Sequence, residues 1–320
     1  MANNVFTSDE NLTKAVSAWP NLNVIYGGCK FLAGLGEEGN IHYTTDTYSY
    51  LLPWEWENTK MLAMDKQHNA VFFGLKNDGT CMITKKPFAG NSSFNQDFSA
   101  TRLWSGNEGF GILHEKVHAL SDIVQIVVDG TILWALDKDG NVHGVPYGRH
   151  FWLYYGWDPH EFLNSIDTKL QTAESWRCVR KMLIAQNDIL IAQKEDGELV
   201  YAGHTGDLFG TFGETAFHKM QDYELIDACS VYGGESAYFA FLDSAHILHC
   251  ERFCKTEGQK FSQIIGLDHS FFGLTDEGTI VQFQGIPMNI SHWPRMKQIS
   301  IGRKCQHQYD NLYLVGIAAD

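Results

Sequence analysis

The sequence predicts an all-β fold built from repeated three-stranded sheets, and three observations lead to this prediction. The first is a recurring phrase of paired apolar residues, an acidic or glycine-bearing turn and an alternating strand. It occurs at Phe31–Tyr43, Val71–Ile83, Ile132–Gly144, Ile189–Tyr201 and Ser270–Gln282, with a weaker copy at Tyr238–Cys250. Such self-similarity marks a repeat architecture, because one unit cannot bury its apolar face alone.

The second observation is that a further apolar segment precedes each copy of the phrase. These segments are Leu22–Tyr26, Met61–Met64, Ile123–Val128, Val179–Ile184, Leu225–Cys229 and Ile264–Leu267. Each unit therefore offers three strands, and turns such as Asp139-Gly140 join the last two, since glycine supplies the positive φ of a tight hairpin. In the weakest copy Ala245 stands at the place we assign to glycine, so that turn must be built differently.

The third observation concerns the two ends of the chain. The segment Val315–Asp320 lines up with Phe73–Asp78, so the chain stops at the hairpin turn of a seventh unit. The missing strand is at the other end, where Asn4–Thr7 resembles Asn40–Tyr43. We therefore predict one domain over residues 1–320, a seven-bladed β-propeller closed by pairing of the terminal strands. Its last blade is shared between residues 1–10 and 293–320, and closure removes exposed sheet edges.

One short helix is predicted in an insertion between the third and fourth units. Asp158 is suited to an N-cap, Pro159 to the first helical position and Glu161 to a capping box. Apolar residues follow at helical spacing, namely Phe162, Leu163, Ile166 and Leu170. This amphipathic pattern indicates a helix that packs on the propeller.

Composition and charge exclude several classes of protein. A hydrophobic share of 44% over 320 residues is enough for a large core. A formal net charge of −14 disfavours binding to nucleic acids or anionic membranes, which depends on clustered lysine and arginine. No long apolar run occurs, the opening residues lack the pattern typical of a secretory signal, and the seven cysteines are scattered and odd in number. We expect a cytoplasmic monomer without a cofactor.

Several residues carry a resemblance to a known family. An apolar first strand is often preceded by tryptophan (Trp19, Trp176 and Trp293), and a glycine and L-x-x-D-G-x-V follow. In the fourth unit, Gly203–Gly210 is similar to a G-x-N-x-x-G-Q-L-G segment. Together these features resemble the repeat of the regulator of chromosome condensation (RCC1) family. The resemblance implies a propeller that binds proteins. Eukaryotic members of the family exchange guanine nucleotide on a small GTPase, but no residue of this sequence is identified that would carry that activity. The basic tails of chromatin-bound members are not found in this sequence.

The sharpest enzymatic signal is the stretch from His114 to His118, which fits H-E-x-x-H. On a helix, His114 and His118 would share a face and bind zinc, with Glu115 as general base. Flanking glycines limit any helix there to about two turns, and no third ligand is evident nearby. We therefore favour a coincidence within a loop. A zinc-dependent hydrolase using these three residues remains the enzymatic alternative.

Aromatic residues concentrate in the insertions between units. They predict a binding surface, because exposed Trp, Tyr and Arg dominate binding hot spots. The candidates are Trp54, Trp56, Trp104, Arg149, Trp152, Tyr154, Tyr155 and Trp157. The competing interpretation is that these aromatics cover blade edges and the helix.

The favoured function is a non-enzymatic scaffold whose loop-bearing face binds a protein or peptide partner. No phosphate-binding loop and no nucleophile elbow occurs in the sequence. An aromatic-lined propeller that binds or cleaves carbohydrate is the third hypothesis, since paired carboxylates can meet without being close in sequence.

Overall fold

The structure is a computed structural model that describes most of the chain. The described residues are 4–28, 32–44, 56–64, 72–83, 106–147, 159–186, 189–203, 220–233, 236–250, 258–267, 269–304 and 311–319. They fall into two compact units, Met1–Thr47 with Thr205–Asp320, and Tyr48–His204.

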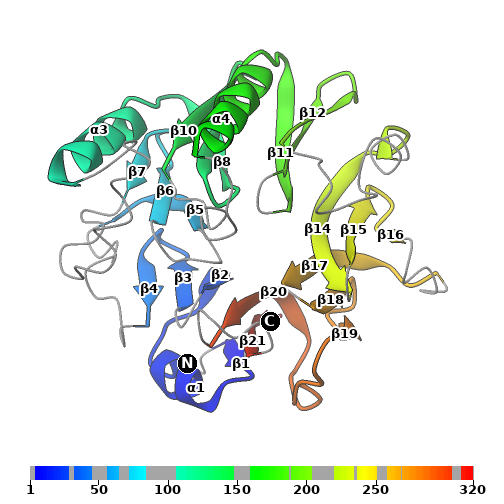
Figure 1. Cartoon of the computed structure of the whole chain (residues 1–320). Helices are drawn as coiled ribbons and strands as arrows, with labels where there is room; N and C mark the ends of the chain where they lie inside the picture. Colours follow the sequence, from blue (N-terminus) through cyan, green and yellow to red (C-terminus); the bar gives the residue numbers. More distant parts are fainter. Residues whose placement is uncertain are drawn as a thin grey trace. The chain divides into compact units, whose positions relative to one another are not determined.

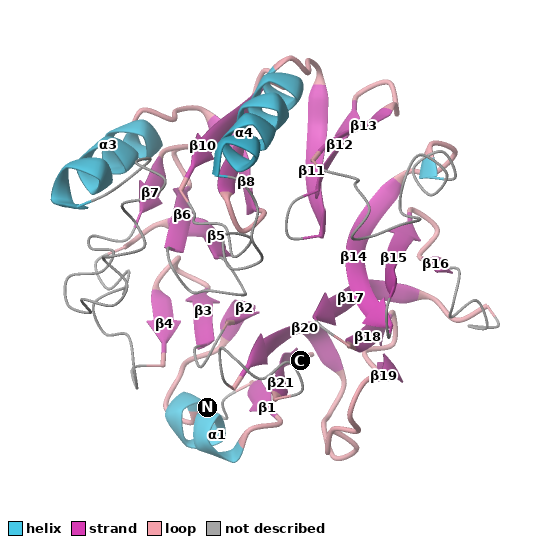
Figure 2. Ribbon diagram, viewed as in Figure 1, coloured by secondary structure: helices cyan, strands magenta, loops and turns pink. Residues whose placement is uncertain are grey.

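The described residues form seven antiparallel sheets of three strands each, which we call blades 1–7 in chain order (Figure 1). Strands dominate both units, and helices are few (Figure 2). The unit Tyr48–His204 holds blade 2 (β5 Thr59–Met64, β6 Phe72–Lys76, β7 Cys81–Ile83), blade 3 (β8 Ile123–Val128, β9 Ile132–Asp137, β10 Val142–Pro146) and blade 4 (β11 Val179–Gln186, β12 Ile189–Lys194, β13 Leu199–Ala202). The all-β class and the seven-blade count expected from the repeats are confirmed.

The other unit holds the remaining four blades. These are blade 1 (β2 Leu22–Gly27, β3 Leu32–Gly36, β4 Ile41–Tyr43), blade 5 (β14 Leu225–Gly233, β15 Ser236–Asp243, β16 Leu248–Cys250), blade 6 (β17 Phe261–Leu267, β18 Ser270–Thr275, β19 Ile280–Gln284) and blade 7 (β1 Val5–Thr7, β21 Leu312–Ala318, β20 Met296–Arg303). Within each unit, buried apolar side chains of successive sheets form shared clusters.

The two ends of the chain pair in blade 7, as predicted. Strand β1 lies antiparallel to β21, with Val5 opposite Ile317 and Phe6 opposite Gly316. The register equals that of β4 on β3, where His42 lies opposite Gly34. The predicted pairing of the terminal strands is therefore confirmed, and its register matches that of the third strand in blade 1.

Each first strand carries a β-bulge near its start, and the residue after the bulge often contacts the next blade. All seven blades show the register shift, for example between Ile123 and Gln125 in β8. The Gln125 amide accepts from the Met182 N–H and donates to its carbonyl oxygen, both at 2.8 Å. Gln263 makes the same pair of bonds to Ile299 at 2.9 Å. A bulge re-aims the side chain that follows it, so these glutamines join neighbouring sheets.

The hairpin turns between the second and third strands adopt positive φ as predicted, except that one residue differs from expectation. Gly39, Gly79, Gly140, Gly197 and Gly278 have φ between 77° and 91°. In blade 5 the positive φ of 66° belongs to His246. Our placement of Ala245 at the glycine position was therefore wrong by one residue. A histidine tolerates this conformation at a steric cost that glycine avoids.

The predicted helix is present, and the described residues form two more that were not predicted. The described helices are α1 (Glu10–Val16), α3 (Gly106–His118) and α4 (Pro159–Glu174). The predicted helix is α4, which begins at Pro159 as expected, while Asp158 lies outside the described residues. Helix α1 begins after Asp9, whose carboxylate caps it by accepting from the Asn11 N–H at 2.9 Å. None of these helices is both long and apolar enough to cross a membrane.

Candidate functional site

The predicted aromatic surface lies almost entirely outside the described residues. This is true of Trp54, Trp104, Arg149, Trp152, Tyr154, Tyr155 and Trp157. Trp56 is described, and it is partly buried. Its indole lies over Gly74 of β6, where an added Cβ would come within 2.7 Å of Cζ3. Trp56 thus covers a blade strand, which is the packing role of the competing interpretation.

The chain on either side of the aromatic insertion is firmly held in the unit Tyr48–His204. Tyr147, the last described residue before it, is 5% exposed, and its N–H donates to the Thr131 carbonyl oxygen at 2.8 Å. The ring of Tyr147 packs edge-on against Phe73, with centroids 5.0 Å apart. Helix α4 follows the insertion and contacts β10 and β13.

A buried ion pair fixes α4 to blade 3. Lys169 of α4 reaches Asp129, with Nζ 2.6 Å from Oδ2, and their side chains are 7% and 0% exposed. The Trp134 indole N–H donates to the same oxygen at 2.7 Å, and Thr131 and Ile132 donate to Oδ1. Burial opposes ionisation of Asp129, but Lys169 and these donors outweigh it and lower the pKa of the carboxyl. This anchor was not predicted from the sequence.

One signal in the sequence could have revealed the anchor. Lys169 stands on the apolar stripe of α4 with Ile166, Leu170 and Ala173, which are buried or partly buried. A lysine in such a place needs a buried partner. The residue that provides it, Asp129, follows the first strand of blade 3 directly.

The H-E-x-x-H stretch lies on the last turns of α3, so our interpretation as a loop was wrong. The helix has 13 residues, longer than the two turns that we expected. Leu113 and Val117 are 2% and 0% exposed and pack in a cluster with residues of blades 2 and 3. Burial of this face fixes the rotation of the helix and leaves Glu115 exposed.

The structure brings the two histidines of this motif together. Nε2 of His118 lies 3.2 Å from Nε2 of His114, and the ring centroids are 4.1 Å apart. Partial burial, His114 and the Lys76 ammonium all lower the pKa of His118. Catalytic zinc sites use three protein ligands. Among the described residues, no group of three or more His, Cys, Asp or Glu side chains could hold a metal.

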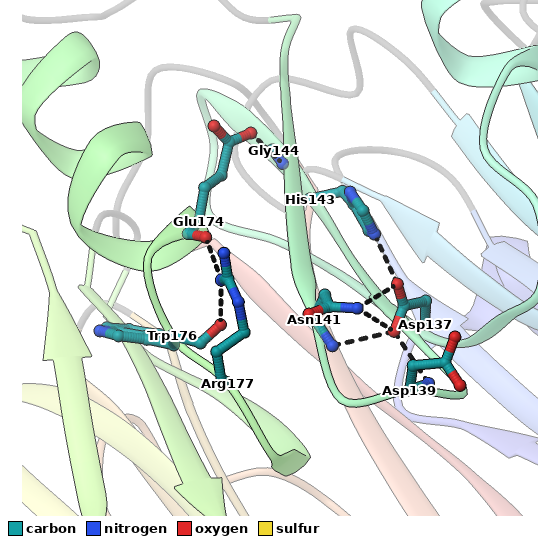
Figure 3. A network of polar contacts seen from close by, with 8 residues as sticks. All are labelled: Asp137, Asp139, Asn141, His143, Gly144, Glu174, Trp176 and Arg177. Carbon is teal, nitrogen blue, oxygen red and sulfur yellow. Dashed lines mark hydrogen bonds and ion pairs between the residues drawn. The ribbon is translucent and has the colours of Figure 1, made fainter.

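A polar network surrounds the hairpin turn of blade 3 (Figure 3). The Asp137 carboxylate accepts from the N–H groups of Asp139 and Asn141 at 2.9 and 2.8 Å, and it lies 2.9 Å from Nε2 of His143. Burial works against ionisation, but the bonds from His143 and Asn141 prevail and lower the pKa of Asp137 to about 2. The network stabilises the turn.

The end of α4 contacts the strand that follows this turn. Glu174 accepts from the Gly144 N–H of β10 at 3.1 Å, and Arg177 donates to the carbonyl oxygens of Glu174 and Trp176, both at 2.7 Å (Figure 3). Both ends of the helix segment from Lys169 to Glu174 are therefore bonded to blade 3.

Blade 5 repeats the aspartate–histidine arrangement. Asp243 accepts from the N–H groups of Ala245 and Ile247, both at 2.9 Å, and lies 2.8 Å from Nε2 of His249. Burial again opposes ionisation of Asp243, but the hydrogen bond from His249 favours it. The net result is that the pKa of Asp243 is lowered. The spacing of Asp137 to His143 recurs here, a signal in the sequence that could have pointed to both pairs. Both pairs lie at repeat turns and bond within their own blade.

Comparison with known proteins identifies the fold. No family model matches the chain, and no curated protein matches it either. Its structure is similar to a chain in the crystal structure of Kap60 bound to yeast RCC1 (Prp20), with a TM-score of 0.56 and 11% identity, covering 96% of this chain and 82% of that one. It is also similar to human WBSCR16, with a TM-score of 0.53 and 13% identity over 94% and 88% of the two chains.

A third similar structure is the ectodomain of the Physcomitrella patens receptor kinase CR4. The TM-score is 0.51 and the identity 10%, and the match covers 87% of this chain and 66% of that one. The chain thus spans just under two thirds of the ectodomain. At such identities the likeness concerns the fold alone. With its seven three-stranded sheets and paired termini, the chain has the fold of an RCC1-like, seven-bladed β-propeller.

Proposed function

We propose that this propeller is a non-enzymatic scaffold that binds a protein or peptide partner. The partner would contact the insertion between blades 3 and 4, where Arg149, Trp152, Tyr154, Tyr155 and Trp157 cluster in the sequence. The observation that carries the proposal is that this aromatic segment runs between two anchors on one blade. Tyr147 is buried before it, and Lys169 of α4 bonds a buried carboxylate after it.

Anchoring of this kind suits recognition. Binding residues are disproportionately found in loops that a rigid scaffold positions. Aromatic side chains add large contact area at small entropic cost. A segment that served only to connect two blades would not need so many large aromatic residues.

The nature of the partner is inferred from charge and from a structural neighbour. A net charge of −14 favours a basic or neutral protein surface over nucleic acid. The similar structure of yeast RCC1 contains a bound protein, Kap60. A protein partner is therefore the simplest expectation for a chain with this fold.

The proposal is tested by site-directed photocrosslinking. A benzophenone amino acid replaces Tyr154 in the native host, and adducts are identified by mass spectrometry. We expect one protein adduct that is lost when Trp152→Ala and Trp157→Ala are added, with no change in thermal stability. The same crosslinker at Lys138, an exposed turn residue, serves as the control and should give no such adduct.

Other outcomes of this experiment contradict the proposal. A double variant that no longer folds would assign the two tryptophans to packing. If the double variant folds and gives the same adducts as the wild type, the two tryptophans are not part of the binding surface. If the wild type gives no adduct but binds an immobilised glycan, and the double variant loses that binding, the carbohydrate hypothesis replaces ours.

A further inference from the structure

We propose that His114 and His118 form a two-histidine chelate site for a divalent transition metal ion of the Zn²⁺ type on α3. The remaining coordination positions are filled by water. This site does not depend on the proposed binding function, and it is not a hydrolase centre.

The distance between the two rings fits one shared metal ion. Zinc binds imidazole nitrogen at about 2.0–2.1 Å, so two nitrogens on a tetrahedral ion lie roughly 3.3–3.4 Å apart. The Nε2 atoms of His114 and His118 are 3.2 Å apart. Each ring must turn so that its Nε2 lone pair points at the ion and no longer at the other ring, but the distance between the two nitrogens need hardly change. In the metal-free protein the same spacing suits an N–H···N hydrogen bond, and on metal binding the donor ring carries that proton on its Nδ1 instead, so that both Nε2 atoms are free to ligate.

The helix holds the two ligands in place before the metal arrives. The residues before His114 and before His118, Leu113 and Val117, are buried beside blades 2 and 3. Their packing prevents rotation of α3, while the i, i+4 spacing keeps both imidazoles on one face. Binding then costs little conformational entropy.

Local charge adjusts the affinity of the site. Metal ligation requires neutral imidazole, and the Lys76 ammonium is close enough to His118 to act on it electrostatically. The Lys76 ammonium also repels a divalent cation. We therefore expect Lys76→Gln to strengthen metal binding.

The arrangement differs from that of a catalytic zinc. Among the residues that the structure describes, no third His, Cys, Asp or Glu completes a ligand set. Glu115 is exposed and is not required as a ligand. A site with two protein ligands binds its metal more weakly than a site with three, and the ion exchanges with the solvent. The added metal ion is therefore enough to probe the site.

The test is calorimetric titration of the untagged, full-length protein with ZnCl₂, followed by Co²⁺ absorption spectroscopy. We expect one site whose affinity falls more than about tenfold in His118→Gln, since even the loss of an outer-shell group costs that much. Glu115→Gln is the matched control on the same helix and should bind normally. A second control removes two exposed histidines of the other unit, His269→Gln with His292→Gln, and should also bind normally.

The outcome separates this site from other ligands and from the proposed function. Binding should weaken at acidic pH, because protons then compete for the imidazole nitrogens. Undetectable Zn²⁺ binding, or equal binding by wild type and His118→Gln, would overturn the proposal. Binding that is lost only in Cys178→Ser would assign the metal to that exposed thiol instead. The photocrosslink at position 154 should be unaffected by His118→Gln.

Discussion

Blades 3 and 5 have the same kind of hairpin turn between their second and third strands, but the surroundings of the turn differ. In both, an aspartate at the end of the second strand accepts backbone N–H groups and lies beside a histidine of the third strand, Asp137 with His143 and Asp243 with His249. The histidine side chain is 43% exposed in blade 3 and 25% exposed in blade 5. The turn is a local property of the repeat, but its surroundings are not.

The difference arises from an exchange of large and small residues along the second strand. Blade 3 has Trp134 followed by Ala135, whereas the equivalent residues of blade 5 are Ala240 and Phe241. Successive residues of a strand point to opposite faces. The large ring is therefore on the face away from the histidine in blade 3 and on the same face in blade 5, where Phe241 stacks on His249 at 4.6 Å.

This exchange has a chemical consequence. A buried indole carries an N–H that needs an acceptor, and Asp129 provides it. A buried carboxylate in turn needs a cation, which Lys169 supplies from α4. The side chain of Phe241 has no polar atom and therefore needs no buried hydrogen-bond acceptor. Blade 3 thus depends on its helix in a way that blade 5 does not.

The largest expected effect comes from removing the Lys169 ammonium that links helix α4 to blade 3. Lys169→Met should lower the free energy of unfolding by about 3–5 kcal/mol, because it leaves the buried charge of Asp129 without its cation. Denaturant unfolding of the full-length protein measures the loss. Adding Asp129→Asn should recover part of it by removing the stranded charge. Lys194→Met, at a partly exposed pair with Glu198, should lower stability far less; equal losses in the two lysine variants would contradict the comparison.

A second contrast between the blades lies in the residue with positive φ. Blade 5 has His246 there, whereas Gly140 of blade 3 faces Cys178 and Val179, and an added Cβ would lie 2.9 Å from the Cys178 Cα. Gly140→Ala should cost at least about 2 kcal/mol, from the left-handed backbone and the overpacking together. Gly197, with φ 91° and nothing within 4 Å of an added Cβ, is the control.

In Gly197→Ala only the backbone strain remains, which amounts to about 1–2 kcal/mol. The difference between the two alanine variants in thermal or denaturant unfolding measures the close contact alone. If Gly197→Ala costs as much as Gly140→Ala, the contact with blade 4 contributes nothing, and the turn glycines serve only the hairpin.

The repeat pattern predicted the parts of the fold that depend on local sequence. The strand order, the Gly140-type turns and the pairing of the two terminal strands follow from alternation, turn chemistry and internal alignment. Contacts that join blades were not predicted. The Gln125 amide reaches Met182 only because a bulge turns it sideways.

Helix α3 shows why the local structure of the His114–His118 stretch was wrongly predicted. Its first residues include Gly106, Gly109 and Gly111, and glycine disfavours helix by about 1 kcal/mol each. Burial of Leu113 and Val117 against the blades outweighs that propensity. The sequence contained both signals, but their balance depends on tertiary contacts.

A third prediction tests whether the same turn behaves alike in both blades. Asp137→Asn should lower the free energy of unfolding by about 1–3 kcal/mol at pH 7, because a charged acceptor of several hydrogen bonds is lost. The lowered pKa of Asp137, about 2, means that its stabilisation is complete above the ordinary value near 4 and disappears as the pH falls towards 2. Urea unfolding between pH 2 and 7 should therefore show the gap between wild type and variant closing below about pH 4.

Asp243→Asn should show a gap that narrows in the same direction, since the pKa of Asp243 is also lowered. Asp139→Asn, at the exposed tip of the same turn as Asp137, is the control and should change stability little at pH 7. A gap for Asp137→Asn that persists undiminished to pH 2 would show that shape and not charge holds the turn.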